Sequence, residues 1–178
     1  MGQPTHPVVH NFQASLALSH EYEDAPWWEV VYRQAFPGFA SMLSVRGDGW
    51  WQRCGIDRVV TLENSRQVLI DEKVRTQDYP DILLEVWSNE AQGTPGWVEK
   101  AQACDYIAYA FVPSQRCFLL PFLPLRRAWR KNRSHWIATY REVRATNDGY
   151  VTVSVAIPIP VLMNAVRNAL VVSWATQE

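Results

Sequence analysis

The sequence has few of the residues that build a disulfide framework or a zinc site. It contains three cysteines, Cys54, Cys104 and Cys117, and no CxxC pair. An odd number of scattered cysteines favours buried thiols in a reducing compartment. The four histidines show neither HExxH nor HxH spacing. The common zinc-binding patterns are therefore missing from this chain.

The chain also lacks long apolar runs, a glycine-rich phosphate loop and an excess of one charge. No uninterrupted apolar run approaches the roughly 18 residues that span a bilayer, and the beginning of the sequence has no signal-peptide pattern. We therefore expect no membrane partner and a soluble protein in the cytoplasm of a bacterium or of an infected host cell. The formal net charge is −1, so any binding to nucleic acid must use local basic patches.

Apolar residues, by contrast, are plentiful. They make up 48% of the 178 residues, which is enough for a real core and argues against disorder. The length favours a single domain over residues 1–178. Within it we expect a loose arm over 1–20, a core over about 24–122, and a basic segment, hairpin and helix over 123–178. The nine tryptophans suit core packing, base stacking or a partner surface, and composition does not choose among these.

Helical spacing predicts a first helix that begins near Pro26 and is capped by Asp24. Its expected buried face consists of Trp27, Val30, Val31 and Ala35. Glu29 and Arg33 are four residues apart on the same helix. They form either an exposed salt bridge or a carboxylate that leans toward a neighbouring metal site.

Apolar and alternating segments predict the remaining elements. Strands are expected over 50–54, 56–62, 67–75, 81–87, 116–122, 136–144 and 150–157. Helices are expected over about 97–111 and from 161 onward. Asn147-Asp148-Gly149 is a strong hairpin turn between the last two strands. The pattern predicts an α/β (α+β) fold with a mixed central sheet flanked by helices and a C-terminal hairpin and helix.

The strand over 67–75 changes from an apolar run into consecutive charges, beginning at Asp71. Side chains alternate along a strand, so Asp71 and Lys73 share one face and Glu72 points to the other. Charges at the end of a buried strand must be solvated or paired. An acid and a lysine held side by side can coordinate a divalent metal and activate a water.

Asp57 can approach Asp71 if the strands on either side of the 63–66 turn pair with each other. Two carboxylates and the main-chain carbonyl of Glu72 would offer hard oxygen ligands for Mg²⁺ or Mn²⁺. Lys73 would orient or deprotonate a water, or neutralise charge on a phosphate. Glu85, on the following strand, would complete a second metal position or hold a water.

Gly55-Ile56-Asp57 followed by Ile70-Asp71-Glu72-Lys73 resembles the PD-(D/E)XK nuclease superfamily over about residues 24–122. The resemblance implies a restriction-endonuclease-like fold: a helix, a three-stranded meander, a second helix and a further strand. It makes Asp57 and Asp71 the metal-binding acids and Lys73 the family lysine. The layout is similar to that of small phage-encoded nucleases.

Gln102 and Tyr106 look like the Q-x-x-x-Y element of RecB-like branches, and the neighbouring Lys100 would contact a phosphate. Glu72 departs from the family pattern, in which the middle residue of the (D/E)xK motif is usually apolar and buried. We therefore expect Glu72 to need a partner or an opening to solvent.

A basic segment follows the core. Its cations and its tryptophan are Arg126, Arg127, Arg130, Lys131, Arg133 and Trp129. Phosphate neutralisation with an aromatic for stacking is one interpretation, and a solvated helix face is the other.

Together these features predict a Mg²⁺- or Mn²⁺-dependent DNA endonuclease. The sequence leaves its oligomeric state open, with a homodimer as one option. A Holliday-junction-type resolvase or an exonuclease would use the same site. A nuclease-like module that only binds nucleic acid or protein is the alternative of another class.

Overall fold

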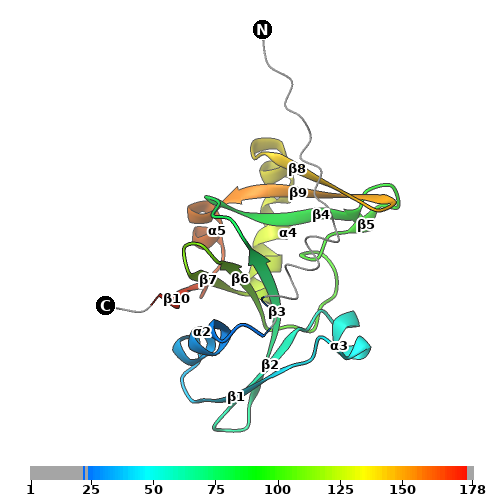
Figure 1. Ribbon diagram of the computed structural model, residues 1–178. Helices are drawn as coiled ribbons and strands as arrows, with labels where there is room; N and C mark the ends of the chain where they lie inside the picture. Colours follow the sequence, from blue (N-terminus) through cyan, green and yellow to red (C-terminus); the bar gives the residue numbers. More distant parts are fainter. Residues whose placement is uncertain (1–21, 23, 176–178) are drawn as a thin grey trace.

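The computed structural model describes Tyr22 and residues 24–175, which form two β-sheets and four helices (Figure 1). The first sheet has six strands in the order β1-β2-β3-β6-β7-β10. They are β1 (Phe39–Ser44), β2 (Arg58–Leu62), β3 (Gln67–Arg75), β6 (Tyr106–Phe111), β7 (Arg116–Pro121) and β10 (Leu170–Ser173). The overall class is therefore mixed α and β, as predicted.

The second sheet has four strands in the order β5-β4-β9-β8. They are β5 (Thr94–Pro95), β4 (Asp81–Asn89), β9 (Tyr150–Pro158) and β8 (Glu142–Asn147). The helices are α2 (Trp27–Ala35), α3 (Gly49–Arg53), α4 (Phe122–Thr139) and α5 (Ile159–Ala165). No helix in the described part of the chain has the length and apolar character needed to cross a membrane.

The first sheet has a core on each of its faces. On β3, Val68 and Ile70 are buried with the apolar side chains of α2. Leu69 faces the opposite core, which lies between the two sheets and includes α4. Because side chains alternate, Asp71 and Lys73 share the face of Leu69. The central strand thus turns Leu69, Asp71 and Lys73 toward the second sheet, whereas Val68, Ile70 and Glu72 lie on the α2 face.

The pairing of β3 explains its position in the molecule. It runs antiparallel to β2, with Arg58 opposite Ile70, and parallel to β6, with Asp71 opposite Ile107. A parallel pair needs a crossover connection. Here that crossover passes through β4 and β5 of the second sheet. The strand predicted over 81–87 exists as β4, but it is not a neighbour of β3.

The predicted helix over 97–111 is wrong. Residues 96–105 form turns and irregular backbone, and β6 follows. Every residue of β6 from Ile107 to Phe111 is buried, because the strand has a core on both faces. A short, continuously apolar strand of this kind has no alternation that would separate it from a buried helix.

Several local predictions also need correction. The strand expected over 50–54 is helix α3, whose N-cap Asp48 accepts a hydrogen bond from the Trp50 N–H at 2.8 Å. Asp24 does not cap α2, because the N-cap is Pro26 and no side chain caps it. Strand β1 was not predicted. In α2 the buried side chains are Trp28, Val31, Tyr32 and Ala35.

The C-terminal part is also divided differently from the prediction. The basic segment and the start of the expected strand over 136–144 form one helix, α4, and β8 begins only at Glu142. The closing helix α5 ends at Ala165 and is followed by β10, which pairs with β7. The predicted hairpin is confirmed, and Gly149 in its turn has φ of +79°. Bounds predicted for β3 are also confirmed.

Gly96 allows the loop after β5 to lie directly against β4. A Cβ atom at this position would fall 2.0 Å from the Glu85 carbonyl oxygen, which is main-chain and cannot move aside cheaply. We expect Gly96→Ala to lower the free energy of unfolding by roughly 1–3 kcal/mol, the usual cost of overpacking. Urea unfolding measures this change.

Gly47 provides the matched control, because no atom of the described residues lies within 4 Å of a Cβ atom built there. Gly47→Ala should change the free energy of unfolding by less than about 0.5 kcal/mol. Equal effects of the two substitutions would show that close packing at Gly96 does not hold the loop against β4.

Candidate active site

Asp57 lies just before β2 and is fixed to β3 by its backbone and by its side chain. Its N–H donates to the Ile70 carbonyl at 2.9 Å. Its Oδ2 accepts a hydrogen bond from the Glu72 N–H at 2.8 Å. Both contacts flank Asp71 on β3, so the predicted approach of Asp57 to Asp71 is confirmed.

Asp71 is a buried carboxylate with one paired and one unpaired oxygen. Its Oδ1 accepts a hydrogen bond from Lys73 Nζ at 2.7 Å. Its Oδ2 has no hydrogen-bond partner among the described residues. Burial raises the pKa of Asp71 to about 6; Lys73 opposes the rise and the neighbouring Asp57 carboxylate adds to it. Two acids that face each other in this way create a local demand for positive charge.

Lys73 supplies part of that positive charge. Burial by itself lowers the pKa of Lys73, but attraction by Asp71, and then by Asp57 and Glu85, raises it above the usual value. The ammonium is therefore protonated at neutral pH. Its Nζ also lies 5.5 Å from the centre of the Trp97 ring. A protonated lysine can neutralise or donate to an oxyanion, and this arrangement does not favour Lys73 as a base.

Glu85 reaches the site from the second sheet. Its Oε2 accepts a hydrogen bond from the Trp97 N–H at 3.3 Å. The cleft there measures about 330 Å³. Its lining side chains, contributed by both sheets and by the 96–105 loop, include Lys73, Arg75, Glu85, Trp97, Tyr109 and Ser154. Glu85 therefore faces Lys73 from the second sheet, and not from a strand next to β3 as predicted.

The Glu72 carboxylate lies on the opposite face of the sheet and does not join the two aspartates. It accepts hydrogen bonds from Tyr32 Oη at 2.6 Å, Arg46 at 2.8 Å and Arg58 at 3.0 Å. The predicted need of Glu72 for a partner is therefore met by three donors. Only the main-chain carbonyl of Glu72 therefore remains a predicted metal ligand, not its side chain.

Sequence reasoning missed the residues that hold Glu72. Arg46 contacts Glu72 and also lies 3.6 Å from Asp57 Oδ2. It therefore links the buried cluster on one face to the carboxylates on the other. Nothing in the spacing of the sequence predicts this contact. Arg75 was detectable, since it shares a strand face with Asp71 and Lys73 by simple alternation.

The predicted supporting residues lie in several places. Glu29 forms an exposed salt bridge with Arg33 at 2.6 Å on α2, on the far side of the sheet, and does not lean toward the site. Gln102 packs against Gly55, two residues before Asp57, but it does so from a loop and not from a helix. Tyr106 packs edge-on against Phe36 in the core beside α2, away from the cleft.

The basic segment does not form a single surface. Trp129 is fully buried, so it is a core residue and cannot stack on a base. Arg126 donates to the Glu99 carbonyl and Arg130 pairs with the Glu99 carboxylate, each at 2.9 Å. Arg133 lies over the Trp87 and Trp129 rings. The remaining two cations, on another side of α4, line a separate groove described below. Lys100 is exposed.

The site suits a hard divalent cation in part. Within residues 24–175 no three His, Cys, Asp or Glu side chains converge as a metal cluster. Of the adjoining carboxylates of Asp57 and Asp71, one buried oxygen of Asp71 nevertheless has no donor among the described residues. Mg²⁺ is commonly held by one or two carboxylates together with waters and substrate phosphate. Two acids are therefore a sufficient protein contribution.

Comparisons of this chain with family models, with curated proteins and with solved structures find no match. The chemistry of the site therefore has to be argued from its own residues.

Asp71→Asn should stabilise the protein at neutral pH. The folded pKa of about 6 lies above the unfolded value of about 3.9, so the ionised carboxylate opposes folding above pH 6. That penalty is roughly 1–3 kcal/mol and disappears as the pH falls from 6 toward 4. Urea unfolding in EDTA should therefore show the variant more stable at pH 7.5 and equal to the wild type near pH 4.

Glu29→Gln is the control, since it also neutralises one carboxylate but at an exposed position. It should produce no comparable change in the free energy of unfolding at either pH. An Asp71→Asn protein less stable than the wild type at pH 7.5 would contradict the inferred strain between the two acids.

Proposed function

We propose that this protein is a Mg²⁺- or Mn²⁺-dependent deoxyribonuclease that hydrolyses phosphodiester bonds. The observation that carries the proposal is the convergence of Asp57, Asp71 and Lys73. Their geometry includes a 2.7 Å Asp71–Lys73 contact and a 2.8 Å hydrogen bond from the Glu72 N–H to Asp57. Two facing acids and a cation suit a reaction that takes place on a phosphate.

The order of the elements supports the same proposal. Helix α2 is followed by the antiparallel strands β1, β2 and β3, and β6 lies parallel to β3. Asp57 lies just before β2, and Asp71 lies within β3. This is the arrangement that the restriction-endonuclease-like resemblance implies. One departure is that strands β4 and β5 and a loop, in place of a helix, connect β3 to β6.

The chain's own groups can be given distinct roles. Asp57 and Asp71 would hold the cation, which when bound would polarise a phosphate oxygen and favour ionisation of a water. Lys73, held as an ammonium by Asp71, would donate to a non-bridging phosphate oxygen and offset charge in the transition state. Glu85 faces Lys73 across the cleft and would accept a hydrogen bond from the attacking water. Water adds to phosphorus as the P–O bond breaks, which leaves a phosphate monoester and a hydroxyl.

Substitutions at the three central residues should abolish cleavage without unfolding the protein. Asp57→Asn, Asp71→Asn and Lys73→Met should each lower kcat by at least about 10²-fold, the cost of losing one group that stabilises transition-state charge. The assay compares linear, nicked, flapped and four-way DNA in Mg²⁺, Mn²⁺, Ca²⁺ and EDTA. The preferred DNA would separate an endonuclease from an exonuclease or a resolvase.

Glu29→Gln should retain full activity, because Glu29 is exposed and paired with Arg33. Cleavage that survives in EDTA, or in Asp71→Asn, would refute the proposed site. A wild-type protein that binds DNA but cuts none of these substrates would favour the non-catalytic alternative.

Metal binding should be measurable without any cleavage. A cation that binds only the folded state raises Tm by mass action, and it needs the ionised acids. Mn²⁺ should therefore raise Tm more at pH 8 than at pH 5, where Asp71 is protonated because its pKa is about 6. Asp57→Asn should lose the shift at both pH values. A shift that is independent of pH and unchanged in Asp57→Asn would place the cation elsewhere.

A further inference from the structure

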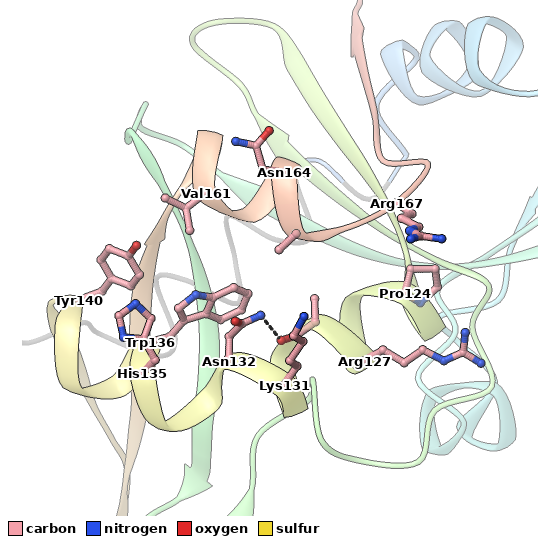
Figure 2. A pocket seen from close by; sticks show the side chains of 12 residues that line it. Pro124, Arg127, Lys131, Asn132, His135, Trp136, Tyr140, Val161, Asn164 and Arg167 are labelled. Atoms are coloured by element: carbon pink, nitrogen blue, oxygen red, sulfur yellow. Dashed lines mark hydrogen bonds between the residues drawn. The ribbon is translucent and has the colours of Figure 1, made fainter.

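A groove of about 670 Å³ lies between α4 and the α5 region, apart from the cleft that holds Lys73 (Figure 2). Among the residues that the structure describes, none lines both hollows. Figure 2 shows side chains of α4 along one wall and those of residues 161–167 along the other. The lining residues are Pro124, Arg127, Ala128, Lys131, Asn132, His135, Trp136, Tyr140, Val161, Asn164, Ala165 and Arg167.

The groove is positively charged on both walls. Arg127 and Lys131 lie one turn apart on α4, and Arg167 faces the groove from the segment after α5. All three are exposed. No carboxylate lines the groove, and none of the three cations forms an ion pair within the described residues. The groove is therefore complementary in charge to an anionic ligand.

The spacing of the cations suits a ligand with repeated negative charges. Arg127, Lys131 and His135 follow one another at intervals of four residues on one helix face. Each step corresponds to about 6 Å along the helix axis. A single compact anion would reach only part of this row, whereas a phosphodiester chain can follow it.

The floor and one end of the groove offer contacts for bases. Ala128, Trp136, Val161 and Ala165 supply apolar surface between the charged walls. The exposed His135 and the half-buried Tyr140 lie together at one end of the row (Figure 2). Sites for single strands typically combine a cationic groove with aromatic side chains.

We propose that the α4–α5 groove binds a single strand of nucleic acid, with Arg127, Lys131 and Arg167 on its phosphates. A single strand exposes both its backbone and its base faces, so it can enter between the walls. A duplex keeps its base faces stacked inside, so it offers such a groove its backbone but no face for stacking. The inference shares its class of ligand with the proposed nuclease, but binding here requires neither Asp57 nor Asp71.

The test measures binding of a fluorescent oligothymidylate of about 12 nucleotides in EDTA, with salt varied from 50 to about 200 mM. The variant combines Arg127→Ala, Lys131→Ala and Arg167→Ala. A charge-matched control combines Arg33→Ala, Arg66→Ala and Arg116→Ala, which are exposed cations outside the groove. Circular dichroism and Tm establish that both triple variants are folded.

We expect the groove variant to lose at least about tenfold in affinity near 100 mM salt. The slope of log K against log salt should flatten by about 2, because each phosphate contact on a single strand contributes about 0.7. The control should keep the wild-type slope. Tyr140→Phe retains the ring and should bind like the wild type, whereas Tyr140→Ala should weaken binding several-fold.

An unchanged slope in the groove variant, or equal losses in both triple variants, would overturn the inference. So would tighter binding of a 12-base-pair duplex than of the single strand. Equal binding of a polyglutamate peptide would assign the groove to acidic peptides instead. Cleavage of duplex DNA in Mg²⁺ separates the two proposals. If the groove variant keeps the wild-type salt slope and still cuts DNA, only the proposed binding site in the groove is refuted. If the wild-type protein binds the single strand but cuts no DNA, only the proposed nuclease activity is refuted.

Discussion

The buried carboxylate of Glu72 fixes three parts of the chain to one another. It accepts hydrogen bonds from Tyr32 on α2, from Arg58 on β2 and from Arg46 in the segment before α3. A buried charge is tolerated only when it is paired and hydrogen-bonded. This cluster fixes the register of β3 against β2 and, with it, the position of Asp57. A shift of β3 by one residue would turn Glu72 to the opposite face of the sheet, away from its three donors.

The two faces of β3 therefore hold acids in opposite states. Glu72 is surrounded by donors, whereas Asp71 faces another acid and has one oxygen that accepts no hydrogen bond from any described residue. The pKa of Asp71 is raised, mainly by burial. A fold selected for stability alone would not leave an acid in this state. That contrast is the physical reason for proposing a chemical role for Asp71 and a structural role for Glu72.

The success of the sequence-based prediction varied with the kind of signal available. The bounds of β3 and the opposite faces of Asp71 and Glu72 were predictable, because strand alternation is a local property. The hairpin at Gly149 was predictable for the same reason. Strand β6 was not, since burial on both faces removes the alternation. The partners of Glu72 could not be predicted either, because Tyr32, Arg46 and Arg58 meet only in the folded chain.

The pairing of β4 with β9 has a consequence for the order in which the molecule is completed. Residues 123–178 looked like an addition to a finished core, yet β9 forms the long antiparallel partner of β4, which carries Glu85. During synthesis the N-terminal part of the chain leaves the ribosome first, at roughly 5–20 residues per second. Strand β4, which carries Glu85, can therefore pair with β9 only after residues 150–158 have been synthesised, so the sheet that faces Lys73 is completed late in synthesis.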